Sequence, residues 1–186
     1  MKKFVNNVEN ILSESLSGFG KAHSDILKVN LSPDFIFRKN KPQNSKVALI
    51  SGGGSGHEPL HGGFVGTGML DAACPGQIFS APTPDQMEAA ANEVHNDKGI
   101  LFIVKNYSGD IMNFEMGSDM IDYEHDTIIV NDDVAVEDST YTTGRRGVAG
   151  TMIVEKTVGS LAETGASLEE CKNFGDHVNE MTGSMG

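Results

Sequence analysis

The chain has 186 residues, with 14 Lys and Arg against 26 Asp and Glu, a formal net charge of −12 and two cysteines. An acidic chain without a basic stripe is a poor partner for nucleic acid or an anionic membrane. Its start turns polar too early for a signal peptide, and its densest apolar run, 100–104, is too short to cross a bilayer. Two distant thiols without metal-ligand spacing are typical of a reducing compartment. We therefore predict one cytoplasmic α/β domain over 1–186.

The first predicted element is an amphipathic helix over residues 3–17, which makes 1–20 an N-terminal helical segment. Its apolar positions recur at helical spacing, at Phe4, Val8, Ile11 and Leu12. Residues 31–45 are rich in Pro, Asn and Lys, and this composition predicts a loop that leads into the first strand.

Four short apolar runs and four helical patterns occupy the rest of the chain. The runs predict strands at 46–50, 76–80, 99–105 and 126–131. The helical patterns are at 84–95, 111–124, 147–163 and 167–181. The last begins with Ser167 and has Glu170 three positions later, which predicts a capping box. Alternating strands and helices indicate βαβ units, so we expect a largely parallel or mixed sheet flanked by helices.

Each predicted strand is followed by a polar or glycine-rich segment. The first strand leads into a glycine run that ends in a histidine, and the later ones lead into short polar loops. These segments are 51–59, 80–83, 105–110 and 131–133. Open parallel sheets bind ligands outside the carboxyl ends of their strands. We therefore predict a single ligand site along this edge.

The glycine run fits none of the common nucleotide or hydrolase signatures. It lacks the Lys-Ser/Thr of a P-loop, the Gly-x-Ser-x-Gly of a nucleophile elbow and the third glycine of a dinucleotide fingerprint. His57 to His61 does match the H-E-x-x-H pattern of zinc hydrolases. That chemistry requires both histidines on one helical face, and Pro59 between them makes such a helix improbable. The zinc hydrolase therefore stays a weak alternative.

Six ordered blocks resemble the substrate-binding K subunit of dihydroxyacetone kinases. They are Gly52–Pro59, Gly62–Leu70, Pro82–Gln86, Lys105–Glu115, Asn131–Asp138 and Gly144–Thr151. The resemblance implies a dihydroxyacetone-binding unit that presents its ketone for phosphoryl transfer to a terminal hydroxyl. It implies that this chain binds no cofactor and no metal, and that ATP or ADP with Mg is held by a separate L subunit. In the phosphotransferase-linked version, an M protein recharges the ADP. Family members are usually homodimers.

The resemblance also assigns roles to residues. The backbone of Gly54, Ser55 and Gly56 would line the substrate pocket. His57 would hydrogen-bond the substrate and assist proton transfer, Lys105 would hold a substrate oxygen, and Asp110 would be the base for the attacking hydroxyl. Phosphoryl transfer relies on positioning and on an oriented nucleophile whose proton a carboxylate accepts, which agrees with this set.

Two departures from the family pattern are visible. Family K subunits are much longer, and their second half supplies a histidine that binds the substrate carbonyl covalently; no residue of 1–186 matches it. The stretch 122–126 is also shorter than usual. We therefore expect this chain alone to show little or no kinase activity. A non-catalytic dihydroxyacetone-binding coactivator or regulator is the alternative, although the presence of both Lys105 and Asp110 speaks against it.

Several residues also have purely structural interpretations. His57 could be a turn histidine, Lys105 could extend from a strand end to solvent, and Asp110 could be a helix N-cap. The acidic pair 132–133 could bind a metal, and Arg145–Arg146 an anion, although ion pairing between the two segments is favoured. Met112, Met116 and Met120 recur at helical spacing and are assigned to the core. His61, His95 and His125 are assigned to surface or packing.

Overall fold

The computed structural model describes residues 3–40, 42, 45–137 and 139–185. Its centre is a six-stranded sheet with the order β1-β2-β4-β3-β5-β6. The strands are β1 (Leu27–Leu31), β2 (Asp34–Arg38), β3 (Ala48–Ser55), β4 (Ala72–Ile78), β5 (Ile100–Lys105) and β6 (His125–Val130). The four strands from β4 to β6 are parallel, whereas β2 pairs antiparallel with both β1 and β4. The predicted mixed α/β sheet is confirmed.

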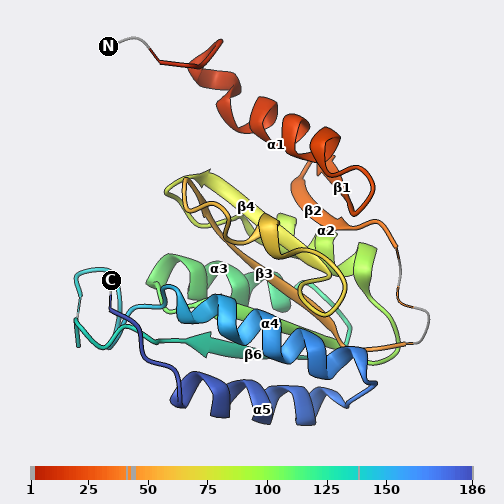
Figure 1. The fold of residues 1–186 in the computed structure, drawn as a ribbon, viewed down its shortest axis with the longest axis vertical. Helices are drawn as coiled ribbons and strands as arrows, with labels where there is room; N and C mark the ends of the chain where they lie inside the picture. The colour runs from red at the N-terminus through yellow and green to blue at the C-terminus, as the bar shows by residue number, and fades with distance from the viewer. Residues whose placement is uncertain (1–2, 41, 43–44, 138, 186) are drawn as a thin grey trace.

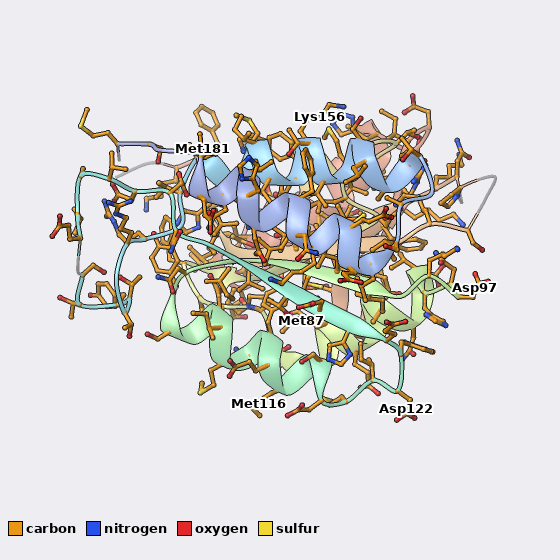
Figure 2. The ribbon with its side chains drawn as sticks, turned by 90° about the horizontal axis from the view of Figure 1, so that it is seen from below. Met87, Asp97, Met116, Asp122, Lys156 and Met181 are labelled. Atoms are coloured by element: carbon orange, nitrogen blue, oxygen red, sulfur yellow. The ribbon has the colours of Figure 1, made fainter. Side chains whose placement is uncertain are left out.

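Helices cover both faces of the sheet (Figure 1). They are α1 (Ile11–Ala22), α2 (Pro84–Val94), α3 (Ser108–Ser118), α4 (Gly150–Glu163) and α5 (Leu168–Glu180). Figure 2 shows α4 and α5 on one side of the sheet and α3 on the other. The buried side chains divide accordingly. Val154 and Val158 of α4 pack on one face, whereas Met87 of α2 and Phe114 of α3 pack on the other.

Strands β3 and β5 form the buried centre of the sheet, because helices cover both of their faces. Every residue of each strand is buried. Doubly covered parallel strands read as continuous apolar runs rather than as alternating ones. This explains why ILFIVK at 100–105 was predicted correctly. Because β4, β3, β5 and β6 are parallel, their carboxyl ends lie along one edge of the sheet.

Residues 31–45 were predicted as a loop, and this is wrong because β2 lies at 34–38. Strands β1 and β2 form a hairpin through Ser32–Pro33, with Leu27 opposite Arg38 and Leu31 opposite Asp34. Pro and Asn were read as loop signals, but they mark the short turn of the hairpin and the segment after it. Strand β1 is the edge of the sheet, whereas β2 lies between β1 and β4 and buries Phe35, Ile36 and Arg38.

The boundaries of the other predicted strands shift by a few residues. The first continues to Ser55, so the glycine run belongs to β3 rather than to the loop after it. The second lies at 72–78 instead of 76–80. Three of the four later helices occur close to their predicted bounds, whereas α3 spans 108–118 instead of 111–124; Ser167 and Glu170 form the capping box of α5.

Two apolar stripes are more exposed than their spacing suggested. The N-terminal helix is Ile11–Ala22 after a short 3-10 turn at Val8–Asn10, and Phe4 and Val8 are exposed. Met112 and Met116 of α3 and Met120 just after it were expected in the core, which is wrong. Met112, Met116 and Met120 are 57%, 52% and 48% exposed, and Figure 2 shows Met116 on the outer side of α3. Phe114 between them is the residue that packs on the sheet.

Within the described ranges, no helix combines the length and the apolarity that crossing a membrane requires.

Candidate functional site

The glycine run shapes the carboxyl end of β3. A Cβ on Gly54 would lie 2.7 Å from the backbone nitrogen of Ser80 and 2.9 Å from Phe79, so the β4 loop can approach only a glycine. Gly56 has a φ of +103°, which favours glycine, and it turns the chain out of the strand. The chain therefore leaves the sheet at this point and places His57 at the sheet edge.

The ring of His57 is oriented by the strand that precedes it. Its Nδ1 lies 2.8 Å from the carbonyl oxygen of Gly54. A carbonyl only accepts, so Nδ1 carries the hydrogen and Nε2 is left for another partner. The ring also contacts Phe79 edge-on, with a centroid distance of 5.2 Å. A histidine fixed in one tautomer with its other nitrogen available is suited to proton transfer.

The segment 57–61 does not form the helix that an H-E-x-x-H zinc site requires. It contains turns and two cis peptide bonds, Glu58–Pro59 and Leu60–His61. His57 is held by Gly54, whereas Nδ1 of His61 faces Glu155 of α4. Among the described residues, no cluster of three His, Cys, Asp or Glu could hold a metal ion. The zinc hydrolase geometry is therefore not formed.

Lys105 and Asp110 lie at the junction of β5 and α3. Both side chains are buried, with exposed fractions of 5% and 6%. The helix begins at Ser108 after Tyr107, so Asp110 lies in the first turn and is not the N-cap that one interpretation suggested. Its carboxylate is favourably placed with respect to the positive end of the helix dipole.

Burial shifts the pKa of each group in the direction that favours its neutral form. Burial raises the pKa of Asp110 above its ordinary value, although Lys105, His61 and His57 pull it down. Burial also lowers the pKa of Lys105, although Asp110 and Glu155 raise it. A desolvated carboxylate beside a desolvated ammonium in a cleft is typical of a functional site.

These groups surround one pocket of about 560 Å³ at the carboxyl edge of the sheet. Its lining includes Gly54, His57, Lys105 and Asp110, so segments from β3, β5 and α3 meet there as predicted. Ser55 and Gly56 are not among its lining residues. The Ser55 hydroxyl donates to the Gly76 carbonyl, and the Gly56 N–H donates to Glu58.

Sequence reasoning missed part of this lining. Phe79 and Tyr141 also face the pocket, whereas Ser80 and Tyr107 belong to the segments 80–83 and 105–110 that were predicted at this edge. Phe79 has a φ of 53°, the left-handed region that a phenylalanine rarely adopts, which marks it as a residue held there by its surroundings. The sequence placed Phe79 inside a predicted strand, so its position at a loop could not be anticipated.

The acidic pair after β6 is structural. Asp133 and Arg146 form an ion pair with an Nη2 to Oδ2 distance of 2.5 Å, which is the interpretation favoured for this segment. Asp132 accepts hydrogen bonds from the backbone N–H groups of Val148 and Gly150 at the start of α4. Arg145 is exposed, and Asp138 of the same acidic run lies outside the described residues.

The remaining histidines differ among themselves. His125 is exposed and His95 stacks on Tyr123 at 3.4 Å, in agreement with their assignment to surface and packing. His61 is neither a surface residue nor a simple packing residue, because it is buried and its Nδ1 lies 2.5 Å from Glu155.

The chain is similar to known proteins over most of its length. The model of the Dak1 domain matches residues 17–186. The dihydroxyacetone-binding subunit DhaK of the PEP-dependent dihydroxyacetone kinase of Escherichia coli K12 is 48% identical over 192 aligned positions, which cover 100% of this chain and 53% of that protein. The chain thus spans about half the length of the curated relatives it matches.

Solved structures show the same fold. The dihydroxyacetone kinase of C. freundii matches with a TM-score of 0.86 and 36% identity, over 95% of this chain and 33% of that one. The dihydroxyacetone kinase operon co-activator Dha-DhaQ matches with a TM-score of 0.79 and 32% identity, over 87% of this chain and 50% of that one. Since the Dak1 model covers most of the sequence, the chain belongs to the Dak1 domain family.

Proposed function

We propose that this chain is the dihydroxyacetone-binding part of a dihydroxyacetone kinase. It presents the ketone for phosphoryl transfer to a terminal hydroxyl, which yields dihydroxyacetone phosphate. The observation that carries the proposal is the meeting of His57, Lys105 and Asp110 around one pocket. Similarity to dihydroxyacetone-binding subunits and to a dihydroxyacetone kinase structure supports it.

Each of the three residues has a role that its surroundings suit. Asp110 accepts the proton of the attacking hydroxyl, and its raised pKa makes it a stronger base than an exposed aspartate. Lys105 holds a substrate oxygen with its buried ammonium. His57 uses Nε2 toward the substrate, because its Nδ1 hydrogen is engaged by Gly54.

The nucleotide belongs to a partner in this proposal. A separate L subunit carries ATP, or ADP with Mg that a phosphotransferase M protein recharges, and the chain acts in the cytoplasm as a homodimer. Phosphoryl transfer depends mainly on positioning and charge stabilisation, so splitting the acceptor and donor sites between two proteins is chemically reasonable. Residues 1–186 alone are expected to bind the ketone without appreciable turnover.

Replacing Asp110 tests the proposal. Asp110→Asn, in the complete subunit with its L partner and donor, should lower kcat by about 10²- to 10⁴-fold, the usual contribution of a general base. Dihydroxyacetone binding, followed by NMR titration, should change little, because the amide keeps the shape of the carboxylate. Unchanged turnover would remove Asp110 from the mechanism.

A second candidate is a dihydroxyacetone-binding coactivator without catalysis, because the co-activator Dha-DhaQ shares the fold at 32% identity. The presence of both Lys105 and Asp110 in the lining of the pocket favours the kinase. Mixing the complete protein with an L subunit and donor separates the two candidates. Bound ketone without any phosphate ester would support the coactivator.

A further inference from the structure

A pair of buried titratable side chains lies directly behind the pocket and has no role in the proposed mechanism. His61 precedes a 3-10 turn, and Glu155 lies on α4; their exposed fractions are 5% and 0%. His61 Nδ1 is 2.5 Å from Glu155 Oε1 and 3.0 Å from the Ser51 hydroxyl. A fully buried carboxylate is rare unless it is paired, so the structure maintains this contact at a considerable desolvation penalty.

The hydrogen bonds around His61 determine its tautomer. The Ser51 hydroxyl donates its proton to the Ile103 carbonyl oxygen at 2.6 Å. It can therefore face His61 only as an acceptor, and the same holds for a carboxylate at Glu155. Both neighbours require a hydrogen on Nδ1. In the neutral imidazole, Nε2 then carries a lone pair.

That Nε2 faces the side of the sheet where Lys105 lies. A Cβ built on Gly53 would be 3.2 Å from His61 Nε2 and 3.1 Å from Lys105 Nζ, so both atoms border the space that the missing side chain leaves. Nε2 is buried without a hydrogen-bond partner in the described structure, as is Oε2 of Glu155. Among the residues that the structure describes, the Lys105 ammonium has no hydrogen-bond partner and no ion-pair partner within 4 Å.

The charges around Lys105 complete the arrangement. Burial lowers the pKa of Lys105, and Asp110 and Glu155 both act to raise it. One of these carboxylates lines the pocket, and the other lies behind it on α4. The Lys105 ammonium thus interacts with carboxylates from two helices, and His61 contacts the one on α4.

We propose that Glu155 and His61 are positioning residues for Lys105. Glu155 holds the Nδ1 hydrogen, so the Nε2 lone pair, which makes no hydrogen bond in the described structure, is available to accept one from the Lys105 ammonium and to direct its other hydrogens into the pocket. Glycine at position 53 leaves room for both nitrogens, because a Cβ there would press on Lys105 Nζ at 3.1 Å and on His61 Nε2 at 3.2 Å. The inference rests on the proposed function only for the identity of the ligand that Lys105 meets.

The tautomer can be measured on the unmodified chain. The ¹⁵N shifts of the His61 ring should show hydrogen on Nδ1 alone at neutral pH. Hydrogen on Nε2, either in the other tautomer or in an imidazolium, would overturn the proposal, because Nε2 could not then accept from Lys105. This measurement needs no variant and no ligand.

The charge of Glu155 is tested by Glu155→Gln, with Glu163→Gln as the matched control. Glu163 lies on the same helix, but its partner is Arg38. In Glu155→Gln, the pKa of Lys105, followed by ¹³Cε NMR, should fall further, and dihydroxyacetone binding should weaken about tenfold, as expected for a hydrogen bond to a charged group. The control should leave both unchanged. Equal values in the two variants would contradict the proposal.

Gly53→Ala tests the geometry without removing any charge. The methyl group presses on both Nζ and Nε2, so dihydroxyacetone binding should weaken while the far-UV circular dichroism stays unchanged. Unaltered binding in a folded Gly53→Ala variant would overturn the proposal. If the wild-type chain does not bind dihydroxyacetone, yet the pKa of Lys105 responds to Glu155→Gln, the proposed function fails and the positioning pair stands.

Discussion

Two lysines are buried at opposite edges of the same sheet, and their surroundings differ. Lys46 precedes β3 at its amino end and is 2% exposed; Lys105 ends β5 and is 5% exposed. The Lys46 ammonium contacts Asp71 Oδ2 at 2.5 Å and the Val47 carbonyl at 2.9 Å. The Lys105 ammonium has no such partner in the described structure, and burial lowers its pKa. A buried charge whose partners are complete stabilises the fold, whereas one with free hydrogens is available to a ligand.

The edge that contains Lys46 is a closed network. Asp71 also accepts from Arg38 Nη1 at 3.0 Å and from the Leu49 N–H at 2.9 Å. Arg38 continues to Glu163 at 2.6 Å and to Thr67. Positive and negative side chains alternate along this network, and both oxygens of the Asp71 carboxylate accept hydrogen bonds. The network connects β2, the start of β3, the segment before β4 and α4.

The largest effect is expected from Asp71→Ala, which would break this closed network. Removing one partner of a buried ion pair destabilises by about 3–5 kcal/mol, because uncompensated charge stays buried. Here Lys46 loses its carboxylate, whereas Arg38 keeps Glu163 and Thr67. Urea unfolding followed by far-UV circular dichroism measures the loss. A change below about 1 kcal/mol would mean that the two edges do not differ as described.

The two lysines can be compared directly as Lys46→Met and Lys105→Met. Lys46→Met should destabilise by about 2 kcal/mol, the range for a hydrogen bond to a charged group, because Asp71 loses a partner. Lys105→Met should leave stability unchanged or higher at pH 7, because it removes a buried ammonium without a partner.

The pH dependence of stability tests the predicted effect of Lys105→Met. The pKa of Lys105 in the folded chain lies below its ordinary value of 10.5, so the charged ammonium destabilises the folded state. This destabilisation disappears above pH 10.5, where the amine is neutral in the folded and the unfolded chain. The gain from Lys105→Met should therefore shrink as the pH rises toward 10.5. Equal losses in both methionine variants would contradict the comparison.

Much of the sheet and part of the site could be predicted, because their signals are local. The run at 100–105 and the capping box at Ser167 are read within a few residues. His57, Lys105 and Asp110 follow strands whose ends meet at one edge, so parallel topology alone brings them together. The family resemblance then supplied their chemistry.

The parts that failed depend on distant contacts. His61 and Glu155 are 94 positions apart, and each looks unremarkable in its own segment. Asp71 and Lys46 are 25 positions apart and meet only because β3 and β4 pair. The methionines of α3 recur at helical spacing, but a period does not show which face of the helix meets the sheet, and here Phe114 does.

A smaller effect is expected from Glu163→Gln, at the solvent side of the closed network. Burial alone would raise the pKa of Glu163, but hydrogen bonds from Arg38 and Gly68 outweigh it, and the pKa is lowered. A lowered carboxyl pKa contributes stability above the ordinary value of 4.5 and loses it as the pH falls through the folded value. The variant should therefore lose about 1 kcal/mol at pH 7 and progressively less as the pH falls below 4.5.

The last test uses the opposite carboxylate, Asp110, for which the sign reverses. Its pKa is raised chiefly by burial, so the ionised form destabilises the folded state, and this penalty is absent below the ordinary value of 3.8, where the group is protonated in both states. Asp110→Asn should therefore stabilise the chain by about 0.5 kcal/mol at pH 7, a size common for substitutions that relieve a functional strain. The gain should vanish near pH 3, whereas the loss in Glu163→Gln persists until its lower pKa is reached. Urea unfolding of both variants between pH 2 and 8 gives two curves of opposite sign. If Asp110→Asn destabilised the chain at pH 7, the carboxylate would be a structural partner like Asp71, and the contrast between the two edges would be lost.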